Sequence, residues 1–179
     1  WVKKVLQAFE RFRLLCAVRE GDWGVTGLNT AIERELIARK RLVKDGPWYA
    51  GRPVMVTRND SALGVLTGDI GITLPSPDGL LRVYFLDGDQ LRSVGVARLA
   101  HIETAFAMTV HKSQGSEFTH AALVLPAYGG SVLGRELVYT GITRAKAQCT
   151  VFTQHPKVLA QALAQPTQRH SGLLEFFDS

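Results

Sequence analysis

The chain has 179 residues, 46% of them hydrophobic and 21% charged, which is an ordinary composition for a globular protein with a core that needs no disulfide or metal. Lys and Arg outnumber Asp and Glu by 21 to 16, an excess that is compatible with a polyanionic partner but does not establish one. No apolar run approaches the roughly 20 residues that cross a bilayer, which argues against a membrane partner and favours a cytoplasmic protein.

The first third of the chain follows an α/β pattern. Apolar residues at helical spacing predict a helix over 2–12, and the apolar run 14–18 predicts a buried parallel strand. A glycine-rich loop follows over 19–27, and Asn29 or Thr30 could cap a helix that runs to about Lys40. Strand, loop and helix in this order form half of a repeating α/β unit.

The segment from about residue 48 to residue 99 has a different texture. Short β-like stretches alternate with turn residues every eight to twelve positions, which favours a small antiparallel barrel. The stretches are 52–58, 64–68, 70–74, 80–86 and 91–96. The α/β pattern then resumes, with strands at 103–108, 119–125 and 149–152, a helix over about 133–145 and a last helix from Pro156. We therefore expect a discontinuous α/β domain, 1–46 and 100–179, with a barrel inserted at 47–99.

The two cysteines, Cys16 and Cys149, lie in apolar runs and are expected to be buried, reduced thiols. No Cys or His pair has zinc-ligand spacing, and no carboxylate cluster suits a two-metal nuclease, so no metal site and no nuclease activity are expected. The chain has neither an initiator Met nor a signal-peptide pattern, and it is expected to be a fragment.

The first chemistry-bearing motif is TVHKSQGSEF, residues 109–118. It follows a predicted strand, so its loop opens at the carboxyl edge of the sheet, where open α/β sheets bind ligands. Thr109 and Ser113 can donate to phosphate oxygens, Lys112 supplies charge, and Glu117 can accept from ribose hydroxyls. The alternative is a solvated turn, since polar loops are common.

The second motif is RELVYTGITRAK, residues 135–146. Its apolar residues form a helical stripe, and Arg144 falls on the other side with Tyr139 and Thr143. Arg144 carries a planar fork that suits phosphate, as the arginines that stabilise phosphoryl transfer do. The alternative is an arginine in a surface salt bridge, which would contribute little.

Together and in this order, the two motifs resemble motifs V and VI of superfamily-1 helicases, in particular the C-terminal motor domain of the RecD branch. LLCAVREGDWGVTGLN resembles the motif IV region, GRPVMVTRNDSALGVLTGDIG the segment that leads into the small barrel, and RHSGLLEFFDS the end of the RecD subunit of exonuclease V. The resemblance implies a RecA-like parallel-sheet motor domain with an inserted Src-homology-type β-barrel.

The resemblance also implies roles for individual residues. Arg144 would be the catalytic arginine finger on the γ-phosphate. The other implied roles are ATP binding for Gly115, Glu117 and Arg19, contact with single-stranded DNA for Thr109 and His111, coupling for Lys112 and Gln114, and support of the finger for Tyr139 and Thr143. On the barrel, Arg52, Arg58 and Asn59 could touch DNA or be ordinary surface. Trp48 and Tyr49 could stack on a base or seal a domain junction.

The chain lacks the Walker A pattern and the nearby carboxylate that bind ATP and Mg²⁺ in such motors. We expect those groups in a preceding motor domain and expect this fragment to be inactive alone. The implied parent is an ATP-dependent 5′–3′ DNA helicase of exonuclease V, acting in double-strand break repair and recombination with RecB- and RecC-like subunits. Three alternatives stay open: the helicase part of a conjugative relaxase, a nucleic-acid-binding or docking module, and a purely structural subunit domain.

Overall fold

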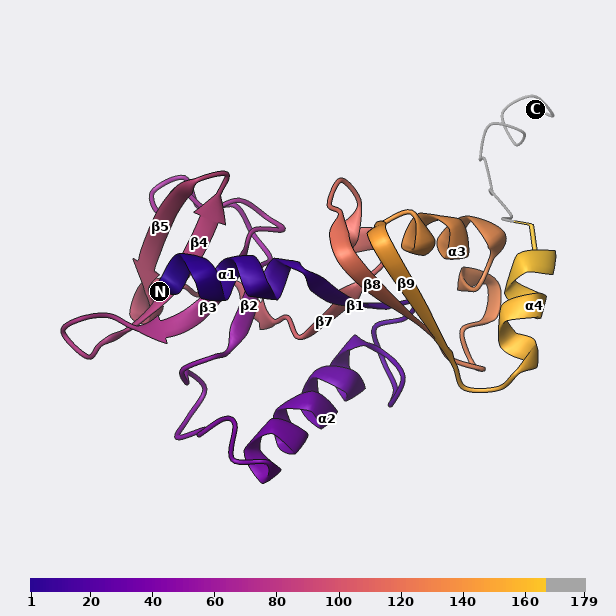
Figure 1. Cartoon of the computed structure of the whole chain (residues 1–179), viewed down its shortest axis with the longest axis horizontal. Helices are drawn as coiled ribbons and strands as arrows, with labels where there is room; N and C mark the ends of the chain where they lie inside the picture. Colours follow the sequence, from indigo (N-terminus) through magenta and orange to yellow (C-terminus); the bar gives the residue numbers. More distant parts are fainter. Residues whose placement is uncertain (167–179) are drawn as a thin grey trace, which may run out of the picture.

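The computed structural model describes residues 1–166, which form two sheets (Figure 1). The parallel sheet has the strand order β7-β1-β8-β9, and the antiparallel sheet has the order β5-β4-β3-β2-β6. The parallel strands are β1 (Phe12–Cys16), β7 (Ala107–Thr109), β8 (Phe118–Leu125) and β9 (Ala145–Thr153). The antiparallel strands are β2 (Pro53–Val56), β3 (Ile70–Pro75), β4 (Leu81–Asp87), β5 (Gln90–Gly95) and β6 (Ile102–Thr104). A mixed α/β fold with a parallel sheet, interrupted by an antiparallel insertion, is thereby confirmed.

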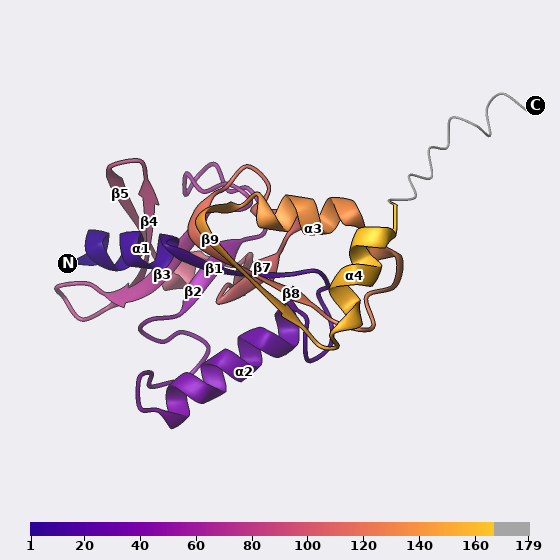
Figure 2. The same ribbon diagram turned by 45° about the vertical axis from the view of Figure 1, so that its right-hand side comes forward.

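Helices cover both faces of the parallel sheet. Helix α2 (Val25–Ala38) lies on one face, and α3 (Arg135–Ile142) and α4 (Lys157–Ala164) lie on the other (Figures 1 and 2). The alternation of side chains along β8 produces this arrangement, because Leu123 packs in the same buried cluster as Val138 of α3, while Val124 points to the opposite face. None of the helices within 1–166 is long and apolar enough to cross a membrane.

Helix α1 (Val2–Glu10) packs on the antiparallel sheet, although the sequence grouped it with the parallel one. Its buried Leu6 lies in one cluster with Ile72, Leu74 and Tyr84. The chain then passes directly into β1, so α1 and β1 connect the two sheets (Figure 1).

The predicted start of α2 is wrong. The helix begins at Val25 after Gly24, one turn before the predicted caps. Asn29 is buried within it, where its amide nitrogen donates to the carbonyl of Ala107 (3.2 Å) and its amide oxygen accepts from the Ala107 backbone N–H (2.9 Å). The amide of Asn29 therefore serves the edge strand β7 rather than the N-terminus of its own helix.

The predicted strand 103–108 is in fact two strands in two sheets. β6 pairs with β2 in the antiparallel sheet, and β7 pairs with β1 in the parallel sheet. The chain changes sheets at Ala105 and Phe106, where the Ala105 N–H still donates to the carbonyl of Pro53 (2.9 Å). The sequence conceals this change, because both halves have strand conformation and only two residues separate them.

The stretch 64–68 is a loop, with only an isolated bridge between Asp60 and Val65. Side chains take the place of a strand ladder here: Thr67 N–H donates to Asn59 Oδ1 (2.7 Å), and Leu66 N–H donates to Asp69 Oδ2 (2.9 Å). Local side-chain bonds of this kind compete with sheet pairing.

The other predicted β-like stretches are strands β2 to β5. In the part of the chain that the structure describes, β5 and β6 lie at the two edges of the sheet, so the predicted barrel is seen as an antiparallel sheet and not as a closed barrel. The last predicted helix is α4, with Pro156 at its N-cap. Both cysteines are free; Cys16 is buried and Cys149 half-buried. The C-terminal stretch 169–179 lies outside the described residues.

Candidate nucleotide and nucleic-acid site

The segment 110–117 runs between the two ends of the parallel strands, from the edge that their carboxyl ends form (the carboxyl edge) to the edge that their amino ends form (the amino edge). It leaves β7 at the carboxyl edge, passes β1, and enters β8 at the amino edge. His111 and Lys112 lie in a short 3₁₀ turn, η2 (His111–Ser113), directly beyond β7, while Glu117 directly precedes β8. The predicted motif is therefore divided between two edges.

At the carboxyl edge, local hydrogen bonds fix the 3₁₀ turn. Thr109 is buried, and its hydroxyl accepts from the backbone N–H of Lys112 (3.2 Å). The buried Ser113 hydroxyl donates to the carbonyl of Val110 (2.6 Å). The side chain of His111 is exposed beside this fixed backbone. Thr109 thus shapes the turn that presents His111.

Glu103 of β6 joins two predicted site residues at this edge. Its carboxylate accepts from Lys112 Nζ (2.5 Å) and from Arg19 Nη2 (3.0 Å). Burial opposes the charged form of Glu103, but the hydrogen bonds from Lys112 and Arg19 outweigh it and lower the pKa of this carboxyl. The hydrogen bond to Glu103 raises the pKa of Arg19. The antiparallel sheet is thereby tied to loops beyond β1 and β7.

At the amino edge, Arg144 joins the two sequence motifs. It follows the end of α3, and its guanidinium donates to the carbonyls of Thr140 (Nε, 3.2 Å) and Ser116 (Nη1, 3.1 Å) and to the Thr143 hydroxyl (Nη2, 3.4 Å). The Phe118 N–H donates to the Arg144 carbonyl (2.8 Å). Within residues 1–166, no carboxylate forms a salt bridge with Arg144. Its charge is therefore fixed in place but not neutralised.

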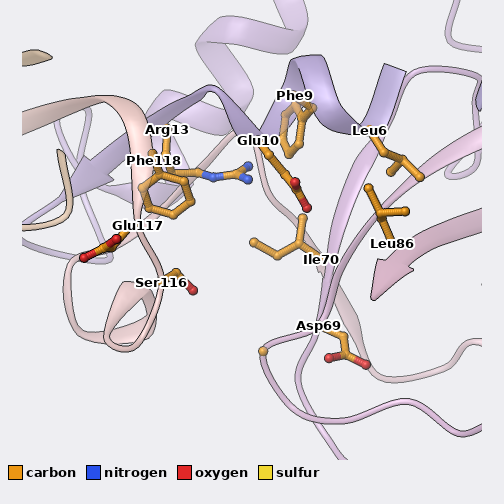
Figure 3. A pocket seen from close by; sticks show the side chains of 11 residues that line it. Leu6, Phe9, Glu10, Arg13, Asp69, Ile70, Leu86, Ser116, Glu117 and Phe118 are labelled. Atoms are coloured by element: carbon orange, nitrogen blue, oxygen red, sulfur yellow. The ribbon is translucent and has the colours of Figure 1, made fainter. Parts of the chain in front are cut away.

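A cavity of about 360 Å³ adjoins this junction (Figure 3). It lies between α1, the start of β3 and the segment that leads into β8. Its lining residues are Leu6, Phe9, Glu10, Arg13, Gly68, Asp69, Ile70, Leu86, Ser116, Glu117 and Phe118. Glu117 and Ser116 come from the predicted motif, so the cavity extends the amino edge toward the antiparallel sheet.

Arg13 is the least expected group in this cavity. Its side chain is buried, and its guanidinium lies over the rings of Phe9 (4.1 Å) and Phe118 (5.0 Å). Nε and Nη1 have no hydrogen-bond partner among the described residues. Burial lowers the pKa of Arg13 to about 10, although the charge of Glu10 partly opposes the shift. Figure 3 shows the guanidinium pointing toward the gap beside Glu10.

The remaining predicted site residues are placed as follows. Gly115 has a φ of +86° and is exposed, a conformation that favours glycine, and Gln114 beside it is exposed. Thr143 contacts Arg144, whereas the Tyr139 side chain is 71% exposed. Arg19 is bonded to Glu103 and is not brought into contact with Arg144 or Glu117.

On the antiparallel sheet, Arg58 is exposed, while the side-chain oxygen of Asn59 is used within its own loop. Trp48, Tyr49 and Arg52 lie at the contact between α2 and the start of β2. Arg52 lies over the Trp48 ring (4.9 Å), and the buried Tyr49 donates its hydroxyl to Glu33 of α2, which also accepts from Lys44. The sequence left two roles open for Trp48 and Tyr49, stacking on a base or sealing a domain junction. Tyr49 lies at a junction, the one between α2 and β2.

Sequence reasoning missed Glu103 and Arg13. Glu103 stands in a short strand, and Arg13 in an apolar run, where the alternation of β1 would have been the only hint of a buried cation. Within 1–166, no three His, Cys, Asp or Glu side chains are arranged to hold a metal ion.

Several known proteins are similar to this chain. The model of the UvrD-like helicase C-terminal domain matches residues 104–152, which include both motifs. The RecBCD enzyme subunit RecD of Haemophilus influenzae is 42% identical over 92% of this chain and 25% of its own length. The Mycobacterium tuberculosis RecD subunit (strain H37Rv) is 40% identical over 94% of this chain and 29% of its own length.

A more distant relative is the ATP-dependent RecD2 DNA helicase of Deinococcus radiodurans, which is 30% identical over 91% of this chain and 23% of its own length. Among solved structures, Pif1 helicase from Bacteroides in complex with ADP-AlF3 and ssDNA covers 94% of this chain and 44% of its own, with a TM-score of 0.50 and 15% identity, a likeness of fold alone. The chain spans about a quarter of the length of the first RecD relatives that it matches. The ordered pair of motifs and these relatives show that the chain is homologous to part of the RecD subunits.

Proposed function

We propose that this chain is the C-terminal motor domain of an ATP-dependent DNA helicase, in which it forms one wall of the ATP site and part of the track for single-stranded DNA. The observation that carries the proposal is the junction of Arg144 with Ser116, which holds an un-neutralised guanidinium beside the Glu117 segment. A fixed positive charge suits the γ-phosphate, because it costs no reorganisation when charge develops during phosphoryl transfer.

ATP would bind against the amino edge, with Arg144 as the arginine finger, Thr143 supporting it, and Gly115 and Glu117 beside the nucleotide. The chain lacks the Walker A pattern and the nearby carboxylate that hold the phosphates and Mg²⁺ in such motors. Groups outside this chain would therefore bind most of the phosphates and the Mg²⁺ that accompanies ATP. For the same reason the chain alone would not hydrolyse ATP.

Single-stranded DNA would pass the carboxyl edge at His111, which the turn beyond β7 presents to solvent. Arg58 on the antiparallel sheet would be a further contact. Because the segment 110–117 extends from this edge to the amino edge, nucleotide binding at the amino edge would alter the position of the residues that contact DNA. ATP binding and release would thus shift the population of DNA-gripping states.

For the parent protein we propose the role that the RecD relatives suggest: 5′–3′ unwinding within an exonuclease V assembly with RecB- and RecC-like subunits, in double-strand break repair and recombination. RecBCD enzyme subunit RecD is the name of several relatives, and this supports the assembly. We also propose the domain bounds 1–46 with 100–179, and 47–99, with β6 (Ile102–Thr104) pairing in the antiparallel sheet just beyond the inserted segment.

Unwinding of tailed duplexes by the full-length protein tests this function. We expect ATP-dependent strand separation of a duplex with a 5′ single-stranded tail and little separation of one with a 3′ tail. Unwinding from the 3′ tail alone would contradict the polarity. DNA binding that ATP does not affect, with no unwinding of either substrate, would favour a docking module instead.

A further inference from the structure

Glu103 gathers two cations from neighbouring strand ends. Arg19 lies beyond β1 and Lys112 beyond β7, and β1 and β7 are paired in the sheet. Each oxygen of the Glu103 carboxylate accepts from one of the two cations. The carboxylate comes from a different sheet, from the middle residue of β6.

This arrangement has the chemistry of an anion site. Arg and Lys side chains that converge on two oxygens recognise a phosphate as they recognise a carboxylate. The side chains of Arg19 and Lys112 are 50% and 32% exposed, so an anion from solvent can reach both. The turn that carries Lys112 is fixed by Thr109 and Ser113, so a phosphate could replace the carboxylate without a change in the turn.

We propose that Arg19 and Lys112 form a phosphate-binding pair and that Glu103 is a positioning residue, which occupies the pair until a phosphate displaces it. The proposal rests on the proposed function, which places single-stranded DNA at this carboxyl edge; the nucleotide is the second source of phosphate that the test distinguishes. Partly exposed ion pairs add little net stability, so the exchange is easily reversible. Displacement would break the ion pairs that tie β6 to the loops beyond β1 and β7.

The test uses Glu103→Gln in the full-length protein, with Glu20→Gln as its matched control. Glu20 is exposed and is next to Arg19 in the chain; its charge acts on Arg19 without a hydrogen bond or salt bridge to either cation among residues 1–166. Both variants remove one negative charge near the pair, but only Glu103→Gln frees the cations. Fluorescence anisotropy would measure the affinity for an oligothymidylate, and separately for ATPγS without DNA, with thermal melting as the check on folding.

We expect Glu103→Gln to tighten the binding of one of these ligands on the order of five-fold, the scale on which a partly exposed ion pair competes. Glu20→Gln should change the same affinity much less. A gain confined to the oligothymidylate identifies DNA as the source of phosphate, and a gain confined to ATPγS identifies the nucleotide. Equal effects of the two variants, or weaker binding by a folded Glu103→Gln protein, would overturn the proposal.

Lys112→Gln provides a second test, which does not require the Glu103→Gln protein to fold. If DNA supplies the phosphate, this change should make the salt dependence of oligothymidylate binding shallower by about 0.7 in log–log slope, the share of one phosphate contact. If the nucleotide supplies it, ATPγS affinity should fall instead. No change in either would overturn the proposal. A wild-type protein that binds neither ligand would refute the proposed function itself.

Discussion

Arg144 is held by oxygen atoms that carry no formal charge: two backbone carbonyls and one hydroxyl. A carboxylate in their place would have cancelled much of the positive field that a phosphate would meet. Carbonyl dipoles instead fix the direction of the guanidinium and leave its charge available. One of these carbonyls belongs to Ser116, so the position of the arginine depends on both motifs at once.

Arg13 presents the opposite situation, a buried cation that two aromatic rings cover and that lacks hydrogen bonds at Nε and Nη1. Since burying an uncompensated charge is costly, Arg13→Met should leave the free energy of unfolding unchanged or raise it, by up to about 4 kcal/mol. A thioether also packs well against Phe9 and Phe118. Thermal melting of the full-length protein checks this, with the exposed Arg11→Met as control. A clear loss of stability only in Arg13→Met would show that Arg13 has a stabilising partner in the cavity.

Single residues differ in how far the sequence predicts them. Arg144 and Glu117 could be singled out because they occur in ordered motifs. Glu103 and Arg13 could not, because each depends on a partner that is distant in the chain: Arg19 is 84 residues from Glu103, and Phe118, one of the two rings over Arg13, is the first residue of the neighbouring strand β8.

Among the elements, α2 depends on one buried side chain for its attachment to β7. Asn29→Ala would remove both hydrogen bonds to Ala107 and leave its backbone N–H and carbonyl without the amide. We expect a loss of about 2 kcal/mol or more in the local stability of β7, because unsatisfied buried groups cost about 1–3 kcal/mol each. Hydrogen exchange of the segment containing β7 in the full-length protein measures this.

The neighbouring Thr30→Ala is a suitable control for Asn29→Ala. The Thr30 hydroxyl donates only to the carbonyl of Thr26 within the same helix, on an exposed surface. Its removal should change the exchange of β7 by less than about 0.5 kcal/mol. Equal effects of the two substitutions would mean that Asn29 does not hold β7.

Hydrophobic periodicity predicted the elements whose pattern is local. It found β1, β8, α3 and α4 to within a few residues. It failed where tertiary contacts decide: the start of α2, where Asn29 bonds another element, and the run 103–108, where the chain changes sheets. Strand alternation shows which residues are buried but not which sheet buries them.

On the scale of the whole molecule, the two sheets share a buried apolar cluster that includes Met55 of β2 and Met108 of β7, and further contacts join them. Helix α1 packs on the antiparallel sheet and leads into β1, Tyr49 and Lys44 bind Glu33 of α2, and Glu103 binds Lys112 and Arg19. The ion pairs of Lys44 with Glu33 and of Lys112 and Arg19 with Glu103 are partly exposed, so these can break and re-form at little cost. Breakable ion pairs around a stable core would suit the proposed motor domain, whose contacts with DNA would have to change during each ATP cycle.

The central claim is that this chain supplies the arginine finger of an ATP site, and ATP hydrolysis by the full-length protein with Arg144→Ala tests it most directly. The measurement is single-strand-stimulated turnover, with ATP and DNA binding measured in parallel and with Arg34→Ala, an exposed arginine of α2, as control. We predict that Arg144→Ala lowers turnover on the order of 10³-fold, while both ligands still bind and Arg34→Ala has no such effect. Turnover that is unchanged in Arg144→Ala would contradict the account.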